Sequence, residues 1–120
     1  MNLELTDQLF IVGGATSGFG KAIATALLHE GANVIVVARG EEKLNEQYGS
    51  NPNAEIVAGD ITEHKVIEQL KTIIGYRQLH GILVNAGGPP AKTVLETTLS
   101  DWDDAYQKLL RWKVELTQTF

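Results

Sequence analysis

Short apolar runs alternate along the chain with segments whose apolar residues recur every three or four positions. Each run ends near a glycine or another turn-forming residue, and each has the length of a single strand. Continuous apolar runs of this length are typical of strands that are buried on both faces of a parallel sheet. The pattern predicts four such strands, at residues 8–12, 33–38, 56–58 and 82–84.

The segments between the runs have the spacing of amphipathic helices. The first helix is predicted to start at Phe19 and to end at Gly31, and a short second helix covers residues 41–48. Thr62 is predicted to cap a third helix, and Ser100 to begin a fourth through a pattern that resembles a capping box. The predicted apolar stripes are Phe19, Ala22, Ile23, Ala26 and Leu27; Val66, Ile67, Leu70, Ile73 and Ile74; and Trp102, Ala105, Tyr106 and Leu109.

Strands and helices follow one another with no linker and no low-complexity segment between them. This order predicts right-handed crossovers and a parallel sheet with helices on both faces. The fold class is therefore α/β, a doubly wound three-layer Rossmann fold, with residues 1–120 as one domain. Gly14, Arg39, Asp60 and Asn85 each follow a predicted strand, so they should meet where such sheets bind ligands, between the first and fourth strands.

Composition excludes several classes of function. Ten Lys and Arg against fifteen Asp and Glu give a net charge of −5, which disfavours nucleic-acid binding. The chain has no cysteine, and its three histidines, His29, His64 and His80, lack metal-ligand spacing, so no metal site is expected. The apolar runs are too short to cross a membrane, and no signal peptide is recognised at the start, so a cytoplasmic location is expected.

The glycine-rich turn after the first strand is the main candidate for binding phosphate. A P-loop needs a glycine five residues before Gly20 and a hydroxyl residue after Lys21, but these positions are Ala15 and Ala22. Gly14, Gly18 and Gly20 instead suit a dinucleotide turn, in which the backbone approaches a pyrophosphate at a helix N-terminus. The hydroxyls of Thr16 and Ser17 can add hydrogen bonds to the same group.

The end of the second strand predicts which dinucleotide is preferred. A site selective for NAD places a carboxylate about 20 residues beyond the glycines, to bind the ribose 2′-hydroxyl. Ala38 and Arg39 occupy this region, and neither is an acid. Because a guanidinium pairs well with a 2′-phosphate, NADP is favoured and NAD remains possible.

Three motifs, each after a predicted strand, resemble those of the short-chain dehydrogenase/reductase family. Residues 12–20, VGGATSGFG, resemble its glycine turn with Gly13 in place of threonine; GDIT resembles its acidic motif; and VNAGG resembles its NNAG motif with Val84 in place of asparagine. The resemblance covers essentially the whole chain, as the N-terminal portion of a small single-domain enzyme. It implies that Asp60 contacts the adenine with Ile61 beside it. The implied cofactor-binding residues are Gly14, Thr16, Ser17, Gly18, Phe19, Gly20, Arg39, Asp60, Ile61, Asn85, Ala86 and Gly87.

No catalytic residue of that family is found in the sequence. The family uses a tyrosine with a lysine four residues later, whereas Tyr48, Tyr76 and Tyr106 are followed at that distance by proline, histidine and leucine. Leu109 stands where the family usually has an asparagine of its proton relay. The chain is therefore expected to be truncated relative to a full reductase.

The leading hypothesis is an NADP-preferring oxidoreductase that acts on a small carbonyl or alcohol, with this chain supplying the dinucleotide-binding half. The alternative is a non-catalytic module that binds a dinucleotide or a partner protein. A methyltransferase of the same topology fits less well, because the acid usual at or before its first glycine is missing.

The last helix also suggests self-association. Related enzymes pair through the helix that is predicted here to begin at Asp101. Leu109, Leu110, Trp112 and Leu116 can form a seam between two copies, or they can pack on the sheet instead. Of Trp102 and Trp112, one is expected to pack inward.

Overall fold

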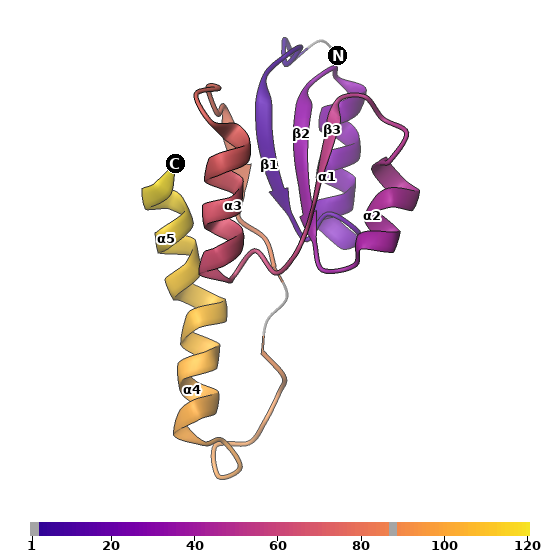
Figure 1. The fold of residues 1–120 in the computed structure, drawn as a ribbon. Helices are drawn as coiled ribbons and strands as arrows, with labels where there is room; N and C mark the ends of the chain where they lie inside the picture. Colours follow the sequence, from indigo (N-terminus) through magenta and orange to yellow (C-terminus); the bar gives the residue numbers. More distant parts are fainter. Residues whose placement is uncertain (1–2, 87–88) are drawn as a thin grey trace.

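The computed structural model describes residues 3–86 and 89–120 and contains one parallel sheet (Figure 1). Its strands are β1 (Leu9–Gly13), β2 (Asn33–Ala38), β3 (Ala54–Ala58) and β4 (Gly81–Leu83), in the order β3-β2-β1-β4. β1 pairs with β2 from Leu9 opposite Asn33 to Gly13 opposite Val37. Each predicted strand is present within two residues of its predicted bounds.

The helices of the described residues follow the strands in alternation. They are α1 (Gly18–His29), α2 (Glu41–Tyr48), α3 (His64–Ile74), α4 (Leu99–Tyr106), the π-helical segment η1 (Gln107–Arg111) and α5 (Trp112–Thr119). α4, η1 and α5 form one continuous rod, and its α4 end projects beyond the sheet (Figure 1).

Two hydrophobic clusters lie on opposite faces of the sheet. Alternate residues of β2 point to different clusters: Val34 and Val36 pack with α1 and α2, whereas Ile35 and Val37 pack with α3 and α5. Figure 1 shows the same division, with α1 and α2 on one side of the sheet and α3 and α5 on the other. The predicted three-layer, doubly wound α/β fold is confirmed.

The buried face of α1 differs from the predicted stripe. Gly20 and Ala24 are its buried residues, while Phe19, Ala22 and Ala26 are exposed. Ile23 and Leu27 of the predicted stripe are partly buried and pack against the same cluster, so the stripe is confirmed in part. Small residues let the helix backbone approach the sheet closely, and Phe19 takes no part in this packing. The α3 stripe is confirmed, because Val66, Ile67, Leu70 and Ile74 are all buried.

Two predicted helix caps are wrong. The N-cap of α3 is Glu63, because the Thr62 hydroxyl instead donates to Oδ1 of Asp60 at 2.7 Å. The capping box of α4 is formed by Thr98 and Asp101, two residues before the predicted pair, so the helix begins at Leu99. Hydrogen bonds from the Thr98 backbone and from Lys92 lower the pKa of Asp101, as is usual for a capping acid.

The rod divides the residues of the predicted self-association seam. Trp112 and Leu116 are fully buried in the α3 cluster, so they belong to the core and not to a free seam. Leu109 and Leu110, in η1, remain half-exposed, as does Trp102. The prediction that one tryptophan packs inward is confirmed for Trp112.

An ion pair also joins the two helices that cover this face. His64, the first residue of α3, pairs with the Glu115 carboxylate of α5. The carboxylate raises the pKa of His64, because it hydrogen-bonds and attracts the protonated ring.

Candidate functional site

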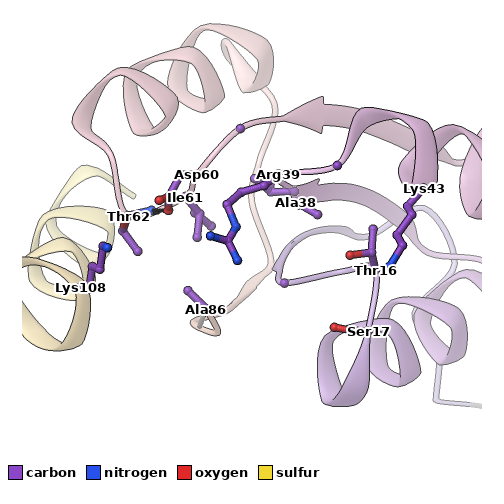
Figure 2. A pocket seen from close by; sticks show the side chains of 14 residues that line it. Thr16, Ser17, Ala38, Arg39, Lys43, Asp60, Ile61, Thr62, Ala86 and Lys108 are labelled. Atoms are coloured by element: carbon purple, nitrogen blue, oxygen red, sulfur yellow. Dashed lines mark hydrogen bonds between the residues drawn. The ribbon is translucent and has the colours of Figure 1, made fainter. Parts of the chain in front are cut away.

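A cavity of about 530 Å³ opens at the carboxyl ends of β1, β2 and β3. This volume falls within the range of roughly 300–1,000 Å³ that is typical of small-molecule sites. Figure 2 shows side chains from both halves of the chain facing the cavity. The predicted site residues that line it are Gly14, Thr16, Ser17, Arg39, Asp60, Ile61 and Ala86.

The glycine turn leaves its backbone open at one point and is tightly packed at another. Gly18 has a φ of +56°, which favours glycine, and beyond its chain neighbours and its own helix backbone no heavy atom lies within 4 Å of the place that a Cβ would occupy. A Cβ on Gly20 would instead collide with the Gly14 carbonyl. Gly18 therefore presents open backbone at the N-terminus of α1, and Gly20 lets that helix pack against the turn.

The turn is held in place by elements that come later in the chain. The backbone N–H of Ala15 donates to the Val37 carbonyl of β2 at 3.2 Å. From α2, the Tyr48 hydroxyl donates to the Ala15 carbonyl at 2.6 Å, and Gln47 Nε2 donates to the Thr16 carbonyl at 3.2 Å. Burial raises the pKa of Tyr48, so its hydroxyl remains a donor at neutral pH.

Replacement of Tyr48 by phenylalanine is therefore expected to lower the free energy of unfolding by about 1–2 kcal/mol, because the buried Ala15 carbonyl loses its donor. The measurement is urea unfolding followed by circular dichroism. Tyr76→Phe is the matched control, since Tyr76 is fully exposed and should tolerate the change. Equal stability of the two variants would contradict this role for Tyr48.

Asp60 forms a compact turn directly after β3. Its Oδ1 accepts hydrogen bonds from the Thr62 backbone N–H at 3.0 Å and from the Thr62 hydroxyl. Gln107 Nε2, from η1, donates to the Thr62 carbonyl at 2.7 Å. Ile61, between them, lines the cavity while it packs in the α3 cluster, so this turn is fixed from both sides.

Asn85 and Ala86 follow β4, and only Ala86 lines the cavity. Asn85 Nδ2 donates to the Gly13 carbonyl at 3.4 Å, which joins the carboxyl ends of β1 and β4. Ala86 lines the cavity. Asn85 therefore positions the glycine turn from behind and is not part of the cavity wall.

Gly18, Phe19 and Gly20 also lie outside the cavity wall, although they were predicted with the site. Phe19 is 82% exposed on the first turn of α1, where its ring points away from the core. Gly87 lies outside the residues that the structure describes.

The cavity carries more positive charge than the sequence motifs suggested. Arg39 extends between Asp60 at one end and Thr16 with Lys43 at the other (Figure 2). Lys43, in the first turn of α2, and Lys108, in η1, complete the charged wall. Asp60 is the one acid among the described residues that line the cavity.

Sequence reasoning missed both lysines and Thr62. Lys43 lies in the first turn of the helix that follows Arg39, so the two residues are close in the sequence. Lys108 lies 48 residues after Asp60, and no local pattern connects it to the cavity.

Residues 3–86 and 89–120 show neither a metal site nor a membrane-spanning helix. They contain no group of three or more His, Asp or Glu side chains that could hold a metal ion. No helix in the same part of the chain has both the length and the apolar character needed to cross a membrane.

Comparison with known proteins supplies matches over most of the chain. A family model described as short chain dehydrogenase matches residues 8–120. An uncharacterised oxidoreductase of Staphylococcus epidermidis is 31% identical over 103 residues, which are 83% of this chain and 45% of that protein. An uncharacterised oxidoreductase of Staphylococcus aureus is 33% identical over 105 residues, with 82% and 45% covered. The chain thus spans a little under half the length of these relatives.

Solved structures also match nearly all of this chain and less than half of their own length. A short-chain dehydrogenase from Streptomyces avermitilis is 29% identical with a TM-score of 0.83, over 94% of this chain and 43% of that one. The fold of L-sorbose reductase from Gluconobacter frateurii, solved with NADPH and L-sorbose, matches with a TM-score of 0.84 at 24% identity, over 100% and 48% of the two chains.

Proposed function

The chain belongs to the short-chain dehydrogenase family, and from this premise we propose that its cavity binds NADPH in preference to NADH. The complete protein would then be an oxidoreductase that interconverts a small carbonyl compound and its alcohol. One observation carries the cofactor proposal: Arg39 and Lys43 face the same cavity as the glycine turn. Residues 1–120 act in this proposal as the dinucleotide-binding unit.

The glycine turn fits the pyrophosphate of such a cofactor. The open space over Gly18 admits an anion to the backbone, and the start of α1 supplies unpaired N–H groups and the positive end of the helix dipole. Thr16 and Ser17 line the cavity beside it and can donate from their hydroxyls. When bound, the nicotinamide of the cofactor supplies or accepts the hydride.

Arg39 and Lys43 supply the preference for a 2′-phosphate. Both side chains are exposed to the cavity, one at the end of β2 and one in the first turn of α2. A phosphate between them would neutralise two cations, whereas the 2′-hydroxyl of NADH would find no carboxylate directly after β2. The NADPH complex of the sorbose reductase, a protein of similar fold, agrees with this proposal.

Replacement of Arg39 by alanine is expected to weaken NADPH binding about tenfold or more while NADH binding changes little, because hydrogen bonds to charged groups contribute about 1.5–3 kcal/mol. Titration of each cofactor, followed by nicotinamide fluorescence or by calorimetry, measures both affinities.

Arg77→Ala is the matched control, because it also removes a guanidinium group. Arg77 pairs with Glu55, and neither residue lines the cavity. Equal affinity of the unchanged protein for NADPH and NADH would contradict the proposed preference. An equal loss of affinity for both cofactors in Arg39→Ala would show that Arg39 has a structural role and does not select the 2′-phosphate.

Two further expectations stay predictions. One is the cytoplasmic location. The other is self-association through the rod, for which Trp102, Tyr106, Leu109 and Leu110 provide exposed apolar surface.

A further inference from the structure

Gln47 connects α2 to the glycine turn but does not itself line the cavity. Its side-chain Nε2 donates to the Thr16 carbonyl at 3.2 Å. We propose that Gln47 is a positioning residue for the cofactor: by holding the Thr16 carbonyl, it fixes the glycine turn in the form that binds the pyrophosphate. This inference rests on the proposed function, because it needs a dinucleotide in the cavity.

Two successive peptide groups of the turn are held from the same helix. The Tyr48 hydroxyl donates to the Ala15 carbonyl, and the Gln47 amide donates to the Thr16 carbonyl. In a planar trans peptide the N–H points away from the carbonyl, so the N–H groups of Thr16 and Ser17 face away from these two donors. No hydrogen bond within the described part of the chain uses these two N–H groups, which leaves them available to a ligand.

The residues that carry these N–H groups belong to the cavity wall. Thr16 and Ser17 both line it, and Figure 2 shows them at the end of the cavity where Lys43 lies. Successive backbone N–H groups in a turn form concavities that bind anions such as phosphate. A turn whose carbonyls are fixed from α2 keeps these donors in place before the cofactor arrives, which reduces the ordering cost of binding.

The exposure of Gln47 separates this role from a general role in stability. Gln47 is exposed on α2, whereas the neighbouring Tyr48 is buried. Loss of a neutral hydrogen bond at an exposed position has little effect on the free energy of unfolding, because water can replace the lost partner. Removal of the Gln47 amide should therefore affect the conformation of the turn more than the stability of the fold.

Gln47 and Lys43 act on different parts of the cofactor in this proposal. They lie one helical turn apart on α2, but only Lys43 lines the cavity. Lys43 and Arg39 are proposed to select the 2′-phosphate, whereas Gln47 acts through the turn that holds the pyrophosphate. A ligand that has a 2′-phosphate but no pyrophosphate can therefore separate the two contributions.

The test replaces Gln47 by methionine, which has a similar length but no hydrogen-bond donor. In equilibrium titrations NADPH and NADH should each bind about three- to tenfold more weakly, since the turn loses one hydrogen bond that fixes it. The preference for NADPH over NADH should remain the same. The affinity for adenosine 2′-phosphate, measured by displacement of NADPH, should change by less than about twofold, because this ligand has no pyrophosphate.

Gln118→Met is the matched control, because Gln118 is exposed on α5 and does not line the cavity. It makes the same chemical change and should leave the affinity for each ligand unaltered. Thermal unfolding of both variants checks that the fold is retained.

Unchanged affinity for NADPH and NADH in a folded Gln47→Met protein would overturn the inference, while the binding that the proposed function requires remains intact. An equal loss of affinity for adenosine 2′-phosphate would also overturn it, because Gln47 would then act on the whole cavity and not through the turn. Failure of the unchanged protein to bind either dinucleotide would instead refute the proposed function, and this inference with it.

Discussion

Replacement of Gly20 by alanine is expected to destabilise the fold by about 1–3 kcal/mol and to weaken dinucleotide binding by two orders of magnitude or more. The added Cβ would collide with the Gly14 carbonyl oxygen and would come within 2.7 Å of the Gly13 carbonyl oxygen. Both contacts are with backbone atoms of the turn, so relief requires α1 to move away from the turn. Urea unfolding measures the first effect, and NADPH titration measures the second.

Gly18→Ala is the informative comparison for this prediction, because it adds the same methyl group to the same turn in open space. Its expected cost is about 1 kcal/mol, caused by the left-handed backbone conformation alone. If Gly20→Ala lowered the free energy of unfolding no more than Gly18→Ala, close packing of α1 on the turn would not be what stabilises this part of the fold.

Replacement of Trp112 by alanine is expected to lower the free energy of unfolding by about 3–5 kcal/mol. Trp112, the first residue of α5, is fully buried against α3 and the sheet. Its indole N–H donates a hydrogen bond to the Lys108 carbonyl. Truncation would leave a large void and would remove the indole hydrogen bond to the Lys108 carbonyl. Denaturant unfolding followed by circular dichroism measures the loss.

Trp102→Ala provides the control, since Trp102 is 56% exposed and should cost less than about 1 kcal/mol. Trp112→Phe separates the two contributions: it keeps most of the packing but loses the hydrogen bond, and should fall between the others. Equal stability of the two alanine variants would contradict the assignment of Trp112 to the core.

The sequence was sufficient to predict the sheet and the four helices α1, α2, α3 and α4, because buried strands and amphipathic helices leave a periodic pattern. Arg39 and Asp60 were predicted to meet for a topological reason: both follow parallel strands, and such strand ends share one edge of the sheet. The structure places both in the wall of one cavity.

The remaining features depend on contacts that leave no periodic signal. The sequence predicts only that Tyr48 ends a short helix and lacks the lysine of a catalytic pair, whereas in the structure its hydroxyl holds the glycine turn from 33 residues away. Lys108 lines the cavity from η1, and the contacts of its neighbours Gln107 and Trp112 hold this segment in place. Both cases need the tertiary arrangement before their role can be seen.

The position of β4 has a consequence for the behaviour of the chain in solution. β4 ends the sheet next to β1, so one of its sides presents peptide groups that no neighbouring strand among the described residues satisfies. Such a border is a template onto which another extended segment can add. Stacking of copies through this border is opposed by the net charge of −5, which makes molecules repel one another at low ionic strength. Higher salt should therefore favour pairing of β4 edges between copies, unless another segment covers this edge.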